Sequence, residues 1–187
     1  MTSYIQLHVE SARPRMGWEP VEHFRECARS LASTCSDVSS RTQIPIAVAE
    51  YLMSKSLSHG VVCWPEFQDL AWASAGISAE VRETNGTDLV GITGAYCAIA
   101  ETGTLMLLSG AHTPAATSLL PETHIAVVHM QRIVRSMEDA WALLRSEHGA
   151  MPRAVNFISG PSRTADIEQT LVLGAHGPYR VHIVIVS

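Results

Sequence analysis

The sequence predicts an α/β protein built around a largely parallel β-sheet. Short apolar segments of strand length recur along the chain, as at 61–64 and 124–129, and they are bounded by Gly, Pro or Thr. Between several of them lie segments whose apolar residues recur three or four apart, which is the spacing of an amphipathic helix. Alternation of the two is typical of α/β proteins, because crossover helices cover the faces of a parallel sheet.

The first third of the chain predicts two helices. Helical spacing begins at Trp18, with Pro20 in the first turn, where a helix accepts proline, and the helix is expected to end within 32–34. A second helix is expected from about Ile44, again with a proline, Pro45, in its opening turn. The next elements are expected to be a strand over 61–64, a helical segment over 66–75 and a strand over 77–82.

The stretch 91–109 is the most informative part of the chain. Two apolar runs, 95–100 and 105–108, have the length and boundaries of buried strands and flank Glu101. Burying a carboxylate is costly unless another group pairs with it. Gly103 lets the backbone turn there or lets a ligand approach closely. Glu101 is therefore the first candidate for chemistry.

The second half of the chain continues the alternation of strands and helices. Asn85-Gly86 predicts a turn. Residues 124–129, which carry Ile125, Val127 and Val128, predict a buried strand. Ser136 and Asp139 have the spacing of a capping box for a helix over 137–147. The remaining segments are expected to form a strand over 155–158, a loop over 159–168, a short helix ending at Leu173 and a final strand over 181–186.

Length and composition favour one globular domain. The chain has 187 residues, of which 47% are apolar and 17% charged, and this balance excludes intrinsic disorder over most of the sequence. A single domain is expected over 18–187, preceded by an arm over 1–17 that is either disordered or lies across a partner subunit. The second alternative would make the protein a homo-oligomer.

Charge and hydropathy argue against nucleic-acid and membrane partners. The formal net charge is −5 and the pI is about 6.0, whereas a nucleic-acid binder needs a basic face. No apolar stretch approaches the roughly 20 residues that span a bilayer. The N-terminus lacks the pattern of a signal peptide, so a cytoplasmic location is expected.

The sequence predicts no metal site and no cofactor held by this chain. The four cysteines, Cys27, Cys35, Cys63 and Cys97, are scattered without a Cys-x-x-Cys pair, which indicates reduced thiols. Histidines, cysteines and carboxylates show no metal-ligand spacing. Neither of the glycine-rich nucleotide-binding fingerprints is present.

Several motifs follow one another in a fixed order over roughly residues 60–187. They are Gly91-Ile-Thr-Gly, Ala100-Glu-Thr-Gly-Thr, Ser118-Leu-Leu-Pro-x-x-His, Ser159-Gly-Pro-Ser-Arg-Thr-Ala-Asp-Ile-Glu and Gly174-x-His-Gly-Pro. In this order they resemble the LUD-domain family, and within it the lactate utilization C proteins. Two places depart from the family's pattern. The family often has an acidic residue where Tyr96 stands and an arginine where Ala115 and Ala116 stand, so the ligand of this chain can differ.

The resemblance implies a three-layer α/β domain similar to those of ribose-5-phosphate isomerases and coenzyme A transferases. It also implies a role in oxidising L-lactate to pyruvate together with partner proteins that carry iron–sulfur clusters. Because the cysteines of this chain lack cluster spacing, any electron transfer is expected in those partners or in a further cofactor.

Glu101 has two open interpretations. Its Glu-x-Gly setting is similar to that of the glutamate in coenzyme A transferases, so it could serve as a nucleophile or base, helped by desolvation. Alternatively it is a structural carboxylate that accepts the amides of Gly103 and Thr104 or pairs with an arginine. Further ligand-binding candidates around it are Thr93, Gly94, Thr102, Gly103 and Thr104.

The segment 159–166 is a candidate anion site. It is expected to leave a strand and enter a helix, where free amides and the helix dipole favour an anion. Arg163 could add a planar fork for a carboxylate or phosphate. An ordinary helix start is the alternative, with Asp166 and Glu168 complementing the dipole. The ligand-binding candidates of this segment are Ser159, Gly160, Ser162, Arg163 and Thr164.

His176 is the second catalytic candidate. It stands in a turn between Gly174 and Gly177, where it could act as an acid, a base or a donor near neutral pH, or only hold the turn.

Three classes of function remain open, and with them the question of whether the chain is an enzyme. The first is a component of a lactate-oxidising system that binds a small carboxylate or a carrier between Glu101, Arg163 and His176. The second is an acyl-transfer or sugar-phosphate isomerase enzyme that uses Glu101. The third is a non-catalytic scaffold or metabolite sensor with the same pocket.

Overall fold

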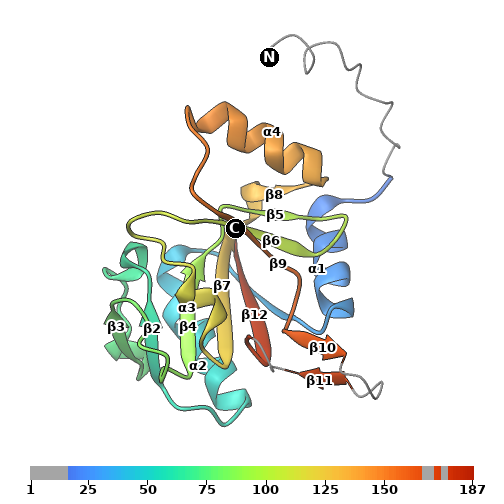
Figure 1. The fold of residues 1–187 in the computed structure, drawn as a ribbon. Coiled ribbons are helices and arrows are strands. Elements are labelled where there is room, and N and C mark those ends of the chain that lie inside the picture. The colour runs from blue at the N-terminus through green and yellow to red at the C-terminus, as the bar shows by residue number, and fades with distance from the viewer. Residues whose placement is uncertain (1–16, 166–170, 174–176) are drawn as a thin grey trace, which may run out of the picture.

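A six-stranded parallel sheet forms the centre of the molecule, with strand order β1-β12-β7-β4-β2-β3 (Figure 1). The computed structural model describes residues 17–165, 171–173 and 177–187. The strands of the sheet are β1 (Thr34–Val38), β2 (Gly60–Cys63), β3 (Ser78–Val81), β4 (Val90–Gly94), β7 (Thr123–His129) and β12 (Arg180–Val186). The predicted α/β class with a largely parallel central sheet is confirmed.

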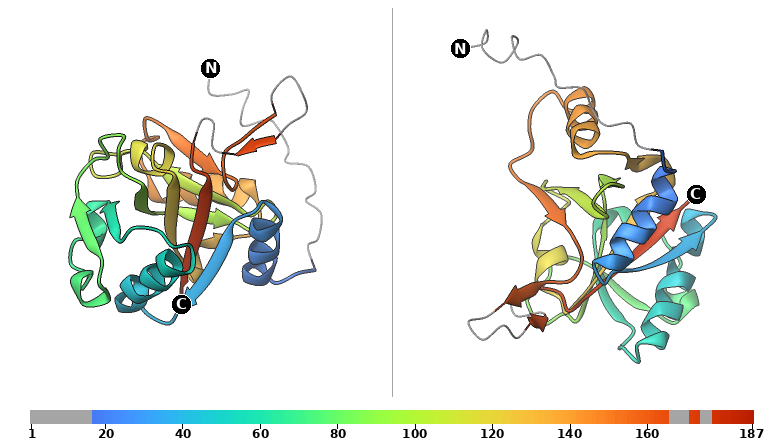
Figure 2. Two further views of the ribbon diagram at one scale, coloured as in Figure 1. Left: turned by 90° about the horizontal axis from the view of Figure 1, so that it is seen from below. Right: turned by 90° about the vertical axis from the view of Figure 1, so that its right-hand side faces the viewer.

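Helices cover both faces of this sheet. α2 (Ile44–Ser54) packs against β1 and β12, while the short α3 (Ala116–Leu119) packs against β4 and β7 from the opposite face (Figures 1 and 2). α1 (Pro20–Ser30) contacts β1. Because both faces are covered, β4, β7 and β12 are buried over nearly their whole length, as the inner strands of parallel sheets usually are.

A second, four-stranded sheet lies beyond the carboxyl ends of the parallel strands (Figure 1). Its order is β8-β5-β6-β9, and α4 (Met137–Glu147) covers its outer face and makes a small separate core with it. The capping box predicted at Ser136 and Asp139 is present at the start of α4. The strands of this sheet are β5 (Cys97–Ile99), β6 (Thr104–Leu108), β8 (Ile133–Val134) and β9 (Val155–Ile158).

The helix predicted over 66–75 is wrong. The segment contains two single 3-10 turns, η3 (Pro65–Phe67) and η4 (Ala73–Ala75), joined by irregular chain. Phe67, Leu70 and Trp72 are all buried, and the Trp72 indole N–H donates to the Phe67 carbonyl at 2.9 Å. A regular helix would keep Phe67 and Leu70 on one face but turn Trp72 away from it, so the irregular backbone is what lets the core take up all three.

The short helix predicted to end at Leu173 is also wrong. β10 (Arg163–Ala165) pairs with β11 (Leu171–Leu173) in an antiparallel hairpin that projects from the body of the domain (Figure 2). A run of three apolar residues with a β-branched valine in the middle suits a strand better than a helical turn.

Strands β1 and β8 were also not predicted. β1 has the polar sequence Thr-Cys-Ser-Asp-Val, because it lies at the edge of the sheet with most of its side chains exposed or half-buried. β8 has only two residues and gives no periodicity to detect.

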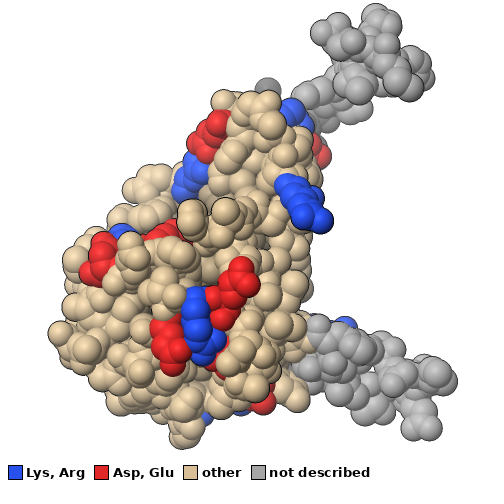
Figure 3. All heavy atoms as spheres, turned by 60° about the vertical axis from the view of Figure 1, so that its left-hand side comes forward, with Lys and Arg blue, Asp and Glu red and all other residues tan. Residues whose placement is uncertain are grey.

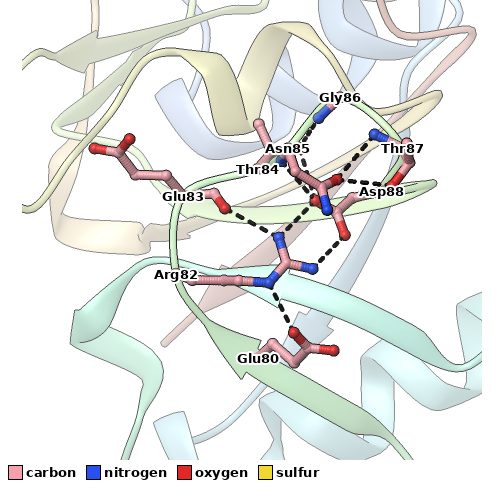
Figure 4. A network of polar contacts seen from close by, with 8 residues as sticks. All are labelled: Glu80, Arg82, Glu83, Thr84, Asn85, Gly86, Thr87 and Asp88. Carbon is pink, nitrogen blue, oxygen red and sulfur yellow. Dashed lines mark hydrogen bonds and ion pairs between the residues drawn. The ribbon is translucent and has the colours of Figure 1, made fainter.

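The turn predicted at Asn85-Gly86 is confirmed and is held by a polar network (Figure 4). Arg82 donates to both carboxylate oxygens of Asp88, at 2.8 and 2.7 Å, and to Glu80 at 2.7 Å. Hydrogen bonding from Arg82 lowers the pKa of Asp88 to about 2. The network therefore ties the end of β3 to the start of β4.

Most of the molecular face seen in Figure 3 carries no charged side chain. Near the middle of this face a basic side chain lies between two groups of acidic ones, and further basic side chains lie toward the top of the view. None of the helices in the described part of the chain is long and apolar enough to cross a membrane. Residues 1–16 of the predicted arm and His176 lie outside the described residues.

Candidate functional site

The connections of the parallel sheet diverge between β2 and β4. The chain passes from β2 to its outer neighbour β3, whereas from β4 it proceeds across the sheet to β7 and then β12. In open α/β sheets, ligands bind outside the carboxyl ends of the strands at such a switch point. Trp64 and Glu66 follow β2, and Ala95 and Tyr96 follow β4, so these residues meet at the expected place.

A cavity of about 470 Å³ lies at this switch point. Its size is within the range of small-molecule sites. Residues after β2 and β4 form one side, the end of β6 and residues 109–113 form another, and His148, Ala150 and Pro152 between α4 and β9 complete it. We refer to it as the carboxyl-edge cavity.

Glu66 is the one carboxylate among the described residues that line this cavity, and the lining includes no lysine or arginine. The backbone amide of Gly94 hydrogen-bonds the carboxylate, and a Cβ built on Gly94 would lie 2.2 Å from its Oε1 atom. Glu66 is exposed as a residue, yet burial of its carboxylate raises its pKa, against the opposing effects of the Gly94 amide and Arg41. A glycine at 94 is therefore what allows the carboxylate to lie against the end of β4.

The segment that carries Glu66 is fixed by Arg41. The guanidinium donates to both oxygens of Asp69, at 2.8 and 2.7 Å, and also to the Glu66 carbonyl. Glu66 also lines a smaller cavity of about 50 Å³, to which Arg41 and His129 contribute. Glu66 thus borders two cavities.

Tyr96 belongs to a network that ties α4 to the wall of the carboxyl-edge cavity. Arg132 donates to the Tyr96 carbonyl at 3.0 Å and to both oxygens of Glu147 at 2.6 and 2.8 Å. The Tyr96 hydroxyl donates to Glu147 at 2.7 Å, and the His148 ring packs edge-on at 5.6 Å. Burial and the neighbouring Glu147 raise the pKa of Tyr96 to about 12, so it remains a donor at neutral pH.

The structure places Glu101 at the start of α4. Its Oε1 accepts the first amide of that helix, Met137 N–H, at 2.8 Å, where the helix dipole favours a carboxylate. This is a structural contact of the kind weighed above, but the amide belongs to Met137 rather than to Gly103 or Thr104. A chemical role of Glu101 stays a prediction.

Gly103 meets another part of the protein at close range. Its φ is +63°, and a Cβ there would lie 2.4 Å from the backbone nitrogen of Ala28 in α1. The Thr104 hydroxyl is 2.8 Å from that of Ser159, while Thr102 is exposed. The close approach that this glycine permits is therefore that of a helix backbone.

The predicted anion segment is built differently from a helix start. Gly160 has φ of +84° and packs on the Leu31 carbonyl, 2.3 Å from where a Cβ would stand, and Ser162 N–H donates to the Pro178 carbonyl at 2.9 Å. Arg163 is exposed where the chain enters β10, which continues through Thr164. Because a strand follows, the helix dipole that motivated the anion site is absent from 163–165.

The two remaining candidates, Thr93 and Gly94, are neighbours at the end of β4 but lie in different surroundings. Thr93 is fully buried and its hydroxyl is 2.8 Å from His124 Nε2, whereas Gly94 lines the carboxyl-edge cavity. Burial lowers the pKa of His124 to about 4, so its ring is neutral. The sequence analysis missed Glu66, although a carboxylate shortly after a predicted parallel strand is a usable signal.

The model of the LUD domain matches residues 49–186 of this chain. Lactate utilization protein C 1 of Bacillus mycoides is 39% identical over 120 residues, which cover 63% of this chain and 51% of that protein. Lactate utilization protein C of Bacillus subtilis is 41% identical over 101 residues, covering 52% and 42%. The chain thus spans about half the length of these curated relatives.

A solved structure supports the same fold. The crystal structure of a DUF162 family protein from Deinococcus radiodurans superposes with a TM-score of 0.69 at 24% identity, covering 93% of this chain and 100% of that one. Because the LUD model matches most of the chain, the protein belongs to the LUD-domain family.

Proposed function

We propose that this chain is a component of a lactate-utilization system and binds an organic ligand in the carboxyl-edge cavity. The names of its relatives support the pathway. The observation that carries ligand binding is the cavity of about 470 Å³ at the switch point, with the Glu66 carboxylate held at its edge by the Gly94 amide.

The lining indicates the chemistry of the ligand. Trp64, Tyr96 and His148 contribute rings, and the cavity's described lining offers one carboxylate and no Lys or Arg. A small anion such as L-lactate would meet the negative charge of Glu66 in a cavity whose described lining has no lysine or arginine to bind the anion. A flat heterocycle with an N–H group directed at Glu66 would stack on the rings and hydrogen-bond the carboxylate. We therefore propose a carrier of this type rather than lactate itself.

Electron transfer is proposed to occur in partner proteins that carry iron–sulfur clusters. The four cysteines of the sequence lack cluster spacing, and within the described residues no group of three His, Cys, Asp or Glu side chains could hold a metal ion. The proposed setting is the cytoplasm, where such partners and reduced thiols coexist. This chain would supply the ligand site.

The experiment is a thermal-shift titration of the purified chain with four probes: riboflavin, menadione, L-lactate and pyruvate. Riboflavin is a flat heterocycle with an N–H donor, whereas menadione is flat without one. At 100 times its dissociation constant a ligand stabilises a fold by about 2.7 kcal/mol, which raises Tm by roughly 5–10 °C for a protein of this size. We expect this shift with riboflavin and none with lactate or pyruvate.

A matched pair of variants locates the binding. Glu66→Gln should weaken the riboflavin shift, because it removes the charge of the hydrogen-bond acceptor. Glu50→Gln makes the same change on an exposed helix surface and should leave the shift intact. If lactate or pyruvate stabilised the protein in place of riboflavin, or if Glu66→Gln had no effect, the proposed ligand class would be wrong.

A further inference from the structure

A second cavity lies at the opposite end of the parallel strands. Its volume is about 150 Å³, and it is bordered by Thr34 and Arg180 at the amino ends of β1 and β12 and by Tyr51 and Lys55 from the end of α2. Cavities of about 150 Å³ hold molecules of benzene size. In Figure 1 these strand ends lie away from the second sheet, so this site is separate from the carboxyl-edge cavity.

The charges at this cavity are positive. Lys55 and Arg180 both line it, and none of its described lining residues is acidic. In the described part of the chain, neither cation lies within ion-pair distance of a carboxylate. Arg180 makes a long hydrogen bond of 3.5 Å to the Thr123 hydroxyl. The two cations are therefore available to a ligand.

Arg180 and Lys55 both affect the pKa values of neighbouring side chains. Burial raises the pKa of Tyr51, whereas a hydrogen bond with Thr34 and, to a smaller extent, the charge of Arg180 oppose that rise, which places the Thr34 hydroxyl and the guanidinium near the phenol. Burial and, to a smaller extent, the charge of Lys55 together lower the pKa of His182 to about 4. Unpaired positive charge at a cavity with hydroxyl donors is the arrangement that attracts an anion.

The hydroxyl groups of the cavity are held by the structure behind it. The Thr34 hydroxyl is 2.8 Å from His182 Nδ1, and His182 Nε2 is 3.0 Å from the Ser36 hydroxyl. The Tyr51 ring stacks on the imidazole with centroids 4.0 Å apart. Tyr51 and His182 are both buried, so packing holds the Tyr51 ring at the cavity wall, whereas the exposed Thr34 is held there by its hydrogen bond to His182.

We propose that this amino-edge cavity binds a phosphate group, either as inorganic phosphate or as the phosphoryl end of a small metabolite. Lys55 supplies a point charge, Arg180 a planar fork of donors, and Tyr51 and Thr34 supply hydroxyls. Two cations and two hydroxyls suit a tetrahedral dianion with several acceptor oxygens, whereas a carboxylate has two oxygens and one charge.

The test is isothermal titration calorimetry of the full chain at constant ionic strength with inorganic phosphate, glycerol 3-phosphate and acetate. We expect saturable binding of phosphate and much weaker binding of acetate. Tighter binding of glycerol 3-phosphate than of phosphate would identify a metabolite as the source of the group, and equal or weaker binding would identify the free ion. Acetate binding as tightly as phosphate, or no saturation with either phosphate compound, would overturn the proposal.

Three variants and a control connect the binding to the cavity. Lys55→Gln, Arg180→Gln and Tyr51→Phe should each weaken phosphate binding about tenfold or more, since each removes a hydrogen bond to a charged ligand. Tyr51→Phe keeps the ring that stacks on His182, so it tests the hydroxyl without removing the packing. Arg145→Gln, an exposed change on α4, should leave the affinity unchanged. Unaltered affinity in all three cavity variants would contradict the assignment.

Discussion

Glu101 and Glu66 show that the sequence context of a glutamate does not determine what its carboxylate faces. Glu101 stands in the motif that resembles a catalytic one, yet its carboxylate accepts the first amide of α4. Glu66 stands in no recognised motif and borders the carboxyl-edge cavity. A motif identifies residues that occur together along the chain, but the groups that a side chain faces depend on segments far away, here Met137 and Gly94.

Substitution of Glu101 separates its structural from its chemical role. Glu101→Ala should lower the free energy of unfolding by about 1 kcal/mol, because α4 loses an acceptor at its first turn. Glu101→Gln keeps an acceptor oxygen and should cost less than this. Urea unfolding of both variants measures the difference.

The same two variants test the chemical role by a second readout. If Glu101→Gln leaves stability near that of the original protein but abolishes lactate-dependent growth in a strain that depends on this chain, the carboxylate does chemistry. If growth is retained, the helix contact accounts for the residue.

At the scale of elements, the well-predicted ones are those whose signals are local. α1, α2 and α4 were predicted because prolines in the first turn or a capping box mark their starts. The polar edge strand β1 and the irregular segment after β2 could not be predicted in this way. The conformation of β1 depends on its pairing with β12, and that of the segment after β2 depends on the burial of Phe67 and Trp72 in the core. Both involve residues far away in the sequence, so a local pattern does not reveal them.

The contact between the β5–β6 turn and α1 depends on Gly103. Gly103→Ala should lower the free energy of unfolding by at least about 2 kcal/mol, since it combines a left-handed backbone with a Cβ placed 2.4 Å from the Ala28 nitrogen. Urea unfolding gives the value. Gly149→Ala is the matched control, because a Cβ there meets nothing within 4 Å, and it should change the free energy by no more than about 0.5 kcal/mol. Equal effects of the two would mean that α1 moves away at little cost.

For the whole molecule, alternation of strands and helices was enough to predict the parallel sheet and the layers around it. It was not enough to predict which segments come together at the carboxyl and amino ends of the parallel strands. The order β1-β12-β7-β4-β2-β3 brings Glu66 next to Gly94 at the carboxyl ends of the strands and Arg180 next to Thr34 at their amino ends. Packing across the whole core determines this order. Of the ligand-binding residues predicted from sequence, Gly94 lines the carboxyl-edge cavity.

The pH dependence of stability should report two buried histidines. Burial lowers the pKa of His124 and of His182 from 6.5 to about 4. Between these values the unfolded chain binds protons that the folded chain does not, so stability is highest above pH 6.5 and falls as the pH drops toward 4. Each histidine contributes a slope of up to about 1.4 kcal/mol per pH unit.

Comparison with one variant isolates the contribution of His182. His182→Gln should make the fall in unfolding free energy between about pH 6.5 and 5 roughly half as steep, because one of the two protonation steps is removed. Arg82 and Arg132 hold the pKa values of Asp88 and Glu147 at about 2, so the stability from those pairs is lost below this window. The raised pKa of Glu66 acts in the opposite direction but equally in both proteins. Urea unfolding at a series of pH values gives both slopes, and identical slopes would mean that His182 has the same pKa in the folded and unfolded protein.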